Sequence, residues 1–143
     1  MATEETLSKV CDEIEIRNLI ARLAHISDEG TADDYASCIT EDSIWRNTIG
    51  PGQERRGRAD CLEGLKQRWT PGKYGTGPGS NTRHIVSTTV VCMKDGVATA
   101  KSYVQLIADS HRIPSFKMMF LYEDEFRRTQ EGWKLAQRQI SHA

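Results

Sequence analysis

The second half of this chain limits its fold most, because four segments rich in β-branched and aromatic residues follow one another there. They read TRHIVSTTVVCM, GVATAKSYVQLIA, SFKMMFLYEDEF and GWKLAQRQI. Short turn signals separate them, at residues 94–96, around residues 109–110 and at residues 129–132. Connections this short join antiparallel neighbours, so the sequence predicts a meander of antiparallel strands.

The first half of the chain carries mainly helical signals. From Glu5 to Ser27 apolar residues recur at steps of three and four, which predicts a helix ended by Gly30. A second, short helix is expected over 31–39 and a third over 58–69, with short strands at 43–50 and 53–57. The segment PGKYGTGPGS is too rich in glycine and proline for a regular element and predicts a loop. We therefore expect one α+β domain over residues 1–143, with three helices and a long curled sheet that is antiparallel or mixed.

Both faces of the predicted sheet are apolar. One face carries His84, Val86, Phe116, Met118, Phe120 and Tyr122, and the other carries Val91, Met119 and Leu121. Three helices can cover only one of these faces. Exposed apolar patches of this size usually mark an interface, so we expect self-association, as a trimer or a dimer, through the second face.

Composition argues against several classes of function. Nineteen basic and twenty acidic residues leave a formal charge of −1, and no basic cluster predicts contact with nucleic acid or a membrane surface. The N-terminus does not resemble a secretory signal, so a cytoplasmic location is expected. The four cysteines lie too far apart for a zinc site or a dense disulfide framework, and are expected to be small buried side chains. The sequence therefore predicts neither a metal nor another cofactor.

In the order of its elements and in several local motifs, the chain resembles the SnoaL-like branch of the nuclear transport factor 2-like superfamily. The motifs are EIRNLIARLAHISDEGTADDYASCITEDSIW, the RH pair of NTRHIVSTTVV, ATAKSYV and YEDEFRRTQEGWKLAQRQI. This branch includes scytalone dehydratase, bile-acid 7α-dehydratase and lindane dehydrochlorinase. The resemblance implies a cone-shaped fold in which the helices and the concave, cystatin-like sheet enclose an apolar pocket.

The resemblance also implies a catalytic pair. Lyases of this branch combine a carboxylate at the end of the first helix with a histidine that begins the first long strand, and Asp28 and His84 occupy these positions. An imidazole on a pocket wall is a versatile proton-transfer group, and a carboxylate bonded to it would orient the ring. The branch often carries a tyrosine five residues before the aspartate, where this chain has Leu23.

Several other side chains are expected to contact the substrate. Trp45 can form a flat pocket wall, Arg138 resembles a pocket cation of the dehydrochlorinase, and His25 lies one helical turn before Asp28. The expected set of substrate-binding residues is Trp45, Leu23, His25, Val86, Phe116, Met118, Phe120 and Arg138. For Trp45, His25 and Arg138 a purely structural or solvent-exposed role is the alternative.

Together these features predict a lyase, of dehydratase or dehydrohalogenase type, or an isomerase that acts on a small hydrophobic cyclic substrate without a cofactor. Two alternatives share the fold. One is a non-catalytic module that binds a hydrophobic ligand or mediates assembly, and the other is the small subunit of a ring-hydroxylating oxygenase. Fold alone does not choose among them.

Overall fold

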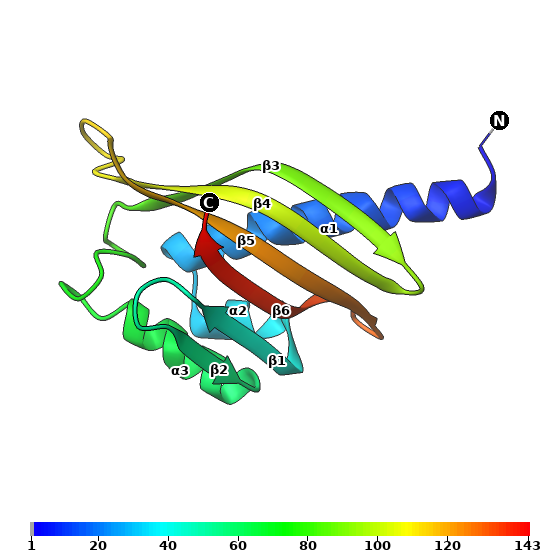
Figure 1. Ribbon diagram of the computed structural model, residues 1–143, viewed down its shortest axis with the longest axis horizontal. Coiled ribbons are helices and arrows are strands. Elements are labelled where there is room, and N and C mark those ends of the chain that lie inside the picture. The colour runs from blue at the N-terminus through cyan, green and yellow to red at the C-terminus, as the bar shows by residue number, and fades with distance from the viewer. Residues whose placement is uncertain (1) are drawn as a thin grey trace.

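Three helices lie against one six-stranded sheet (Figure 1). The computed structural model describes residues 2–143. The helices are α1 (Glu4–Glu29), α2 (Ala32–Ser37) and α3 (Arg58–Arg68). The strands are β1 (Ile39–Asn47), β2 (Gln53–Arg56), β3 (Arg83–Lys94), β4 (Val97–Ala108), β5 (Ser115–Thr129) and β6 (Gly132–His142). This confirms the predicted α+β architecture.

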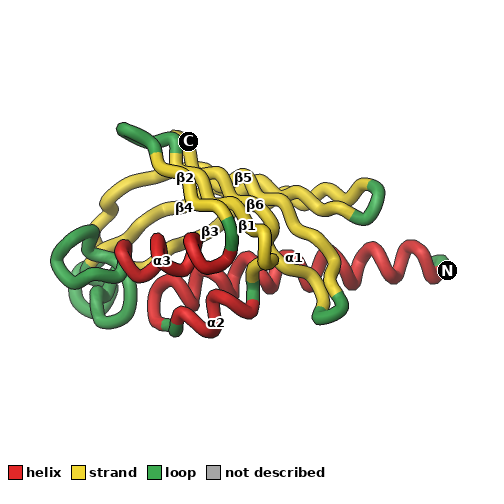
Figure 2. The backbone as a smooth tube through the Cα atoms, turned by 90° about the horizontal axis from the view of Figure 1, so that it is seen from below, coloured by secondary structure: helices red, strands yellow, loops and turns green. Residues whose placement is uncertain are grey.

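The strand order is β2-β1-β6-β5-β4-β3, so the meander predicted for the second half of the chain is present. Strands β3, β4, β5 and β6 pair antiparallel with one another in succession, whereas β1 pairs with β6 in parallel. The sheet is therefore mixed, one of the two expected forms, although the partner of β1 was not predicted. Figure 2 shows the sheet curving over the helices, which lie together on its concave side.

The long helix α1 begins and ends with local stabilising contacts. Its N-cap Thr3 accepts a hydrogen bond from the Thr6 amide, and the Gly30 amide donates to the Ile26 carbonyl at 2.8 Å. A Cβ atom at Gly30 would lie 2.7 Å from the Ile26 Cα atom, so glycine is needed where the chain leaves the helix. Within residues 2–143, no helix combines the length and apolar character that crossing a membrane requires.

The apolar stripe of α1 is only partly buried, which differs from the sequence prediction. Its second half packs in the core through Ile16, Leu19, Ile20, Leu23 and Ile26. Its first half extends beyond the sheet, and Leu7, Val10 and Ile14 are about half exposed there (Figure 1). Helical periodicity identified the element correctly, but it could not show where the sheet that covers the stripe ends.

An irregularity in β3 reverses which of its side chains face inward. In β3 the pairing register shifts between Ser87 and Val90, and Thr88 has a positive φ of 54°. As a result Val91 packs against the core and Val90 is 59% exposed, so the prediction that Val91 lies on the outer face was wrong. A β-bulge inserts one extra residue and reverses the alternation beyond it.

The four cysteines are free, and only two of them are buried. Cys38 and Cys61 lie in the core, whereas Cys11 and Cys92 are exposed. The prediction of four buried thiols was therefore wrong for Cys11, on the overhanging part of α1, and for Cys92. Cys92 follows the bulge in β3, which turns its side chain to the outer face of the sheet.

Candidate active site

A cavity of about 580 Å³ lies between the helices and the concave face of the sheet. Its volume falls in the range of about 300–1,000 Å³ that is typical of small-molecule sites. Large apolar side chains supply much of its wall: Trp45, Leu65, Trp69, Leu106, Met118, Phe120 and Ile140. Its polar groups come from Tyr35, Arg68, His84, Tyr122 and Arg138, among others. The cavity suits an apolar cyclic molecule with a few polar contacts.

Asp28 and His84 form a close pair at this cavity. The Nδ1 atom of His84 lies 2.6 Å from the Oδ1 atom of Asp28. The backbone amide of His84 also donates to the same carboxylate, at 3.1 Å to Oδ2 and 3.3 Å to Oδ1. The Asp28 side chain is buried, and the His84 side chain is 14% exposed and lines the cavity. The hydrogen bond expected from the sequence is therefore present.

The hydrogen bond to Asp28 selects one tautomer of the neutral imidazole. A carboxylate accepts hydrogen bonds, so the neutral ring places its proton on Nδ1, toward Asp28. This leaves the Nε2 lone pair free, and no described residue in 2–143 hydrogen-bonds to that atom. If Nε2 takes up a proton, the adjacent carboxylate stabilises the imidazolium that forms. The pair can therefore work as a general base and then as a general acid.

Helix α3 and the loop after it hold the pair in position. The indole Nε1 atom of Trp69 donates to the Ser27 carbonyl at 2.9 Å, next to Asp28. The loop packs against the same indole, because a Cβ atom at Gly77 would lie 2.4 Å from the Trp69 Cδ1 atom. Gly77 also has a φ of +96°, which few other residues adopt. Tyr74 and Thr76 of this loop line the cavity.

Two buried tyrosines add neutral hydrogen-bond donors. Tyr35 on α2 and Tyr122 on β5 both line the cavity. Burial raises the pKa of Tyr35, and burial raises the pKa of Tyr122 to about 12 although Arg138 opposes the shift. Both phenols therefore stay protonated at neutral pH. Each can donate to a carbonyl or hydroxyl oxygen of a bound molecule.

Arg138 lies at the cavity, as expected, but its charge is already compensated. Its Nε and Nη2 atoms each lie 2.8 Å from an oxygen of Asp124, and both side chains are almost completely buried. Burial alone would lower the pKa of Arg138, yet the Asp124 carboxylate raises it above its usual range. The guanidinium also lies over the Tyr122 ring, 3.8 Å from its centroid. Arg138 is therefore not an uncompensated cation in the pocket.

The structure places half of the predicted substrate-binding residues at the cavity. Trp45, Met118, Phe120 and Arg138 line it, whereas Leu23, His25, Val86 and Phe116 do not. Leu23 is completely buried in the core, Val86 packs against that core, and His25 faces solvent on α1.

Phe116 lies outside the cavity because of an irregularity in β5 that the sequence pattern does not reveal. Leu106 pairs with Met118 and the next residue, Ile107, pairs with Phe116, so β5 contains one extra residue at this point. This irregularity reverses the alternation, and Phe116 is 60% exposed. The prediction that Phe116 lines the pocket was therefore wrong.

Sequence reasoning missed several polar or aromatic residues of the cavity, among them Tyr35, Arg68, Trp69 and Tyr122. The sequence placed Tyr122 on one face of the predicted sheet but did not single it out as cavity wall. No local motif marks Arg68. Within residues 2–143, no group of three or more histidine, cysteine or acidic side chains is arranged to hold a metal ion.

A curved sheet that encloses an apolar cavity with a carboxylate–imidazole pair defines a class of small α+β cone domains. The chain belongs to the SnoaL-like domain family, whose sequence pattern matches residues 8–139. No curated protein sequence matches it. Its fold is the cystatin-like, nuclear transport factor 2-like fold of the solved structures that it resembles.

Three solved structures illustrate this similarity. An NTF2-like protein from Novosphingobium aromaticivorans is 21% identical, with a TM-score of 0.76 over 98% of this chain and 90% of that one. A candidate aromatic ring hydroxylase from the same organism is 20% identical, with a TM-score of 0.73 over 93% and 90%. ActVI-ORFA from Streptomyces coelicolor is 21% identical, with a TM-score of 0.74 over 91% and 96%. At these identities the likeness establishes the fold.

Proposed function

We propose that this protein is a cofactor-free lyase or isomerase that acts on a small hydrophobic cyclic molecule. The hydrogen bond of 2.6 Å between His84 and Asp28, at the wall of an apolar cavity, carries this proposal. The bond points the free Nε2 atom away from Asp28, and the ring is only slightly exposed to bulk water. A base in such a place can reach a substrate carbon while solvent is largely kept away.

In the proposed reaction, Nε2 of His84 takes a proton from a carbon atom of the substrate. The electrons of that C–H bond then form a double bond. In a lyase, a neighbouring carbon loses its substituent as water or halide, and the imidazolium can supply the proton that a hydroxide needs. In an isomerase, the imidazolium returns the proton to a different carbon. Asp28 stabilises the cationic ring in either case.

Proton removal from carbon is easier when a neighbouring oxygen is polarised. The tyrosine that the related lyases use is replaced by Leu23, which lies outside the cavity. Tyr35 and Tyr122 offer two protonated phenols at the cavity wall, and the pKa of Tyr122 is raised to about 12. Either phenol can donate to a substrate carbonyl and stabilise the enolate that develops.

A binding module with the same cone is the competing function. Such a module would use the cavity wall, Trp45 in particular, but would not need proton transfer at His84. The small subunit of a ring-hydroxylating oxygenase is a further alternative, and the similarity to a candidate ring hydroxylase concerns the fold alone. The hydrogen bond between Asp28 and His84 favours the lyase or isomerase over these two alternatives, because binding a ligand does not require a general base.

The test is turnover by wild type and variants on hydroxylated and halogenated alicyclic compounds, ketosteroids and polyketide-like aromatics. His84→Ala should lower the rate by roughly a hundredfold or more while leaving ligand affinity nearly intact, because a positioned general base contributes about that much. Asp28→Asn should also slow turnover, since an amide stabilises an imidazolium less well than a carboxylate. His25→Ala is the matched control, because His25 is a solvent-exposed histidine on the same helix as Asp28.

Exchange of substrate C–H for deuterium in heavy water, followed by NMR, detects the base even where no group leaves. Exchange by the wild type and not by His84→Ala supports the proposal. Equal rates in the two proteins would remove His84 as the base. Tight binding without turnover or exchange on any compound would favour the binding module.

A further inference from the structure

Arg68 is the cation of the cavity for which residues 2–143 provide no acidic partner. It ends helix α3 and lines the cavity. Its guanidinium lies over the Trp45 ring, with the Cζ atom 4.2 Å from the ring centroid. Among the described residues 2–143, no carboxylate forms an ion pair with it and no acceptor hydrogen-bonds to its side chain. The Nη1 atom is buried and has no hydrogen-bond partner.

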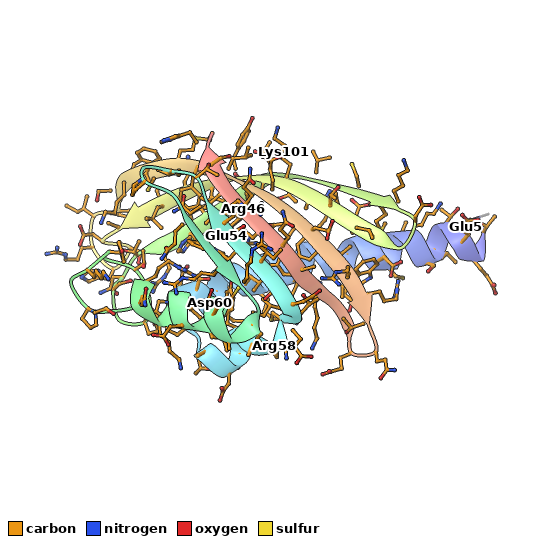
Figure 3. All side chains as sticks on the ribbon, turned by 60° about the horizontal axis from the view of Figure 1, so that its bottom comes forward. Glu5, Arg46, Glu54, Arg58, Asp60 and Lys101 are labelled. Atoms are coloured by element: carbon orange, nitrogen blue, oxygen red, sulfur yellow. The ribbon has the colours of Figure 1, made fainter. Side chains whose placement is uncertain are left out.

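The arginines nearby are treated differently. On β1 and β2, Arg46 pairs with Glu54 at 2.7 Å (Figure 3) and Arg55 pairs with Asp60 at 3.0 Å. Within the cavity, Arg138 has its bidentate partner Asp124. Arg68 therefore differs from these three arginines in lacking an acidic partner.

The groups that act on Arg68 include no acid but one further cation. Burial lowers the pKa of Arg68 and Arg55 lowers it further, while the groups that oppose this shift, two phenols and the Cys61 thiol, are neutral at physiological pH. The face of Trp45 attracts the cation but accepts no in-plane hydrogen bond. A guanidinium carries five N–H donors, and leaving the buried Nη1 group without an acceptor is unfavourable. A ligand with an anionic oxygen group would supply both the missing charge and the missing acceptors.

We infer that Arg68 is the anion-recognition residue of the cavity and that its ligand is a cyclic, mainly apolar molecule that carries a carboxylate. The planar guanidinium matches the two oxygens of a carboxylate. The apolar walls, including Trp45 and Phe120, match the ring of such a molecule. This inference rests on the proposed use of the cavity for a small hydrophobic molecule, but not on turnover by His84.

The experiment compares 2-naphthoate with 2-naphthamide, which have the same ring system and differ in charge. Binding of both compounds is measured by calorimetry at about pH 8. The proteins are wild type, Arg68→Met, Arg68→Lys, His84→Ala and Arg46→Met. Arg46→Met is the matched control, since it also removes one arginine but from a site outside the cavity.

We expect the wild type to bind the carboxylate at least roughly tenfold more tightly than the amide, the range of one charge-assisted hydrogen-bonded pair. Arg46→Met and His84→Ala should keep this preference. Arg68→Met should abolish it, and Arg68→Lys should retain part of it, because an ammonium keeps the charge but not the paired donors. Circular dichroism and thermal melting establish that each variant is folded. If Arg68→Met does not fold, the comparison of Arg68→Lys with the wild type decides.

The inference is overturned if the wild type does not bind the carboxylate or shows no preference for it, or if the preference persists in folded Arg68→Met. Loss of the preference in His84→Ala instead would assign the anion to the imidazole and also overturn it. These outcomes are separate from the test of the proposed function. A protein can prefer the carboxylate through Arg68 and still show no proton transfer at His84.

Discussion

Asp28 illustrates how one side chain can serve both the fold and the site. Its carboxylate accepts hydrogen bonds from the His84 ring and from the His84 backbone amide, and so joins the end of α1 to the start of β3. The ring orientation and the approach of the two elements therefore depend on the same group. Removing the carboxylate would disturb the imidazole and loosen the contact between helix and strand. For this reason Asp28→Asn, which keeps the shape, is a better probe than a smaller residue.

At the same scale, Tyr122 should make the folded protein less stable at alkaline pH. Its pKa is raised to about 12 in the folded protein, against an ordinary value near 10. A raised folded pKa contributes stability that is fully present below about pH 10 and is lost as the pH rises through about 12. The free energy of unfolding, measured with urea, should fall across this window. In Tyr122→Phe the fall should be smaller, by roughly 3 kcal/mol at about 1.4 kcal/mol per pKa unit.

Tyr103→Phe is the matched control, because Tyr103 is an exposed tyrosine on the outer face of β4. It should follow the wild-type curve. An alkaline loss of stability in Tyr122→Phe equal to that of the wild type would contradict the assignment of the raised pKa to this phenol.

At the scale of elements, the short helix α2 depends on its first residue. Six residues make a helix too short to be stable alone. The Thr31 hydroxyl accepts from the Asp34 amide at 3.1 Å, and the Asp34 carboxylate accepts from the Thr31 amide at 3.2 Å. This reciprocal capping box satisfies amides that the helix leaves free. Because α2 carries Tyr35, the cap also holds part of the cavity wall in place.

Thr31→Ala should therefore lower the free energy of unfolding by about 1 kcal/mol, the usual cost of losing an N-cap hydroxyl. Denaturant unfolding measures this change. Thr31→Ser, which keeps the hydroxyl, should stay close to the wild type. A serine variant as unstable as the alanine variant would show that the methyl group of Thr31, and not the cap, is responsible.

At the scale of the whole molecule, the outer face of the sheet remains to be covered. Side chains of β3, β4 and β5 form an exposed patch there: Ile85, Val90, Tyr103, Met119 and the less exposed Leu121. Lys101, visible in Figure 3, pairs across the strands with Glu123 beside this patch. Because the patch is apolar and bordered by charges of both signs, we propose that it contacts a second copy of the chain.

Light scattering at micromolar concentration should accordingly give a mass of two or three times 16.1 kDa, the mass of one chain. Met119→Lys should shift the distribution to monomer, because it places a charge in the apolar contact. Gln130→Lys adds the same charge in the exposed turn between β5 and β6 and should leave the assembly intact. A monomeric wild type, or an unchanged mass for Met119→Lys, would rule out assembly through this face.

The sequence by itself determined the elements of this protein and their order. Hydrophobic periodicity and turn residues depend on neighbours along the chain, so they located α1, α3 and the four long strands to within a few residues. Family resemblance, and not periodicity, singled out Asp28 and His84, which lie 56 positions apart. The hydrogen bond between them is present, and their catalytic role stays a prediction.

Only the tertiary structure decided which side chains share the cavity. Two sheet irregularities move Val91 inward and Phe116 outward, and an alternating pattern gives no sign of where an extra residue is inserted. Arg68 becomes notable only because its buried Nη1 atom has no hydrogen-bond partner among the described residues, which no local pattern can reveal. Periodicity follows from the geometry of a single element, whereas a cavity depends on how several elements are placed relative to one another.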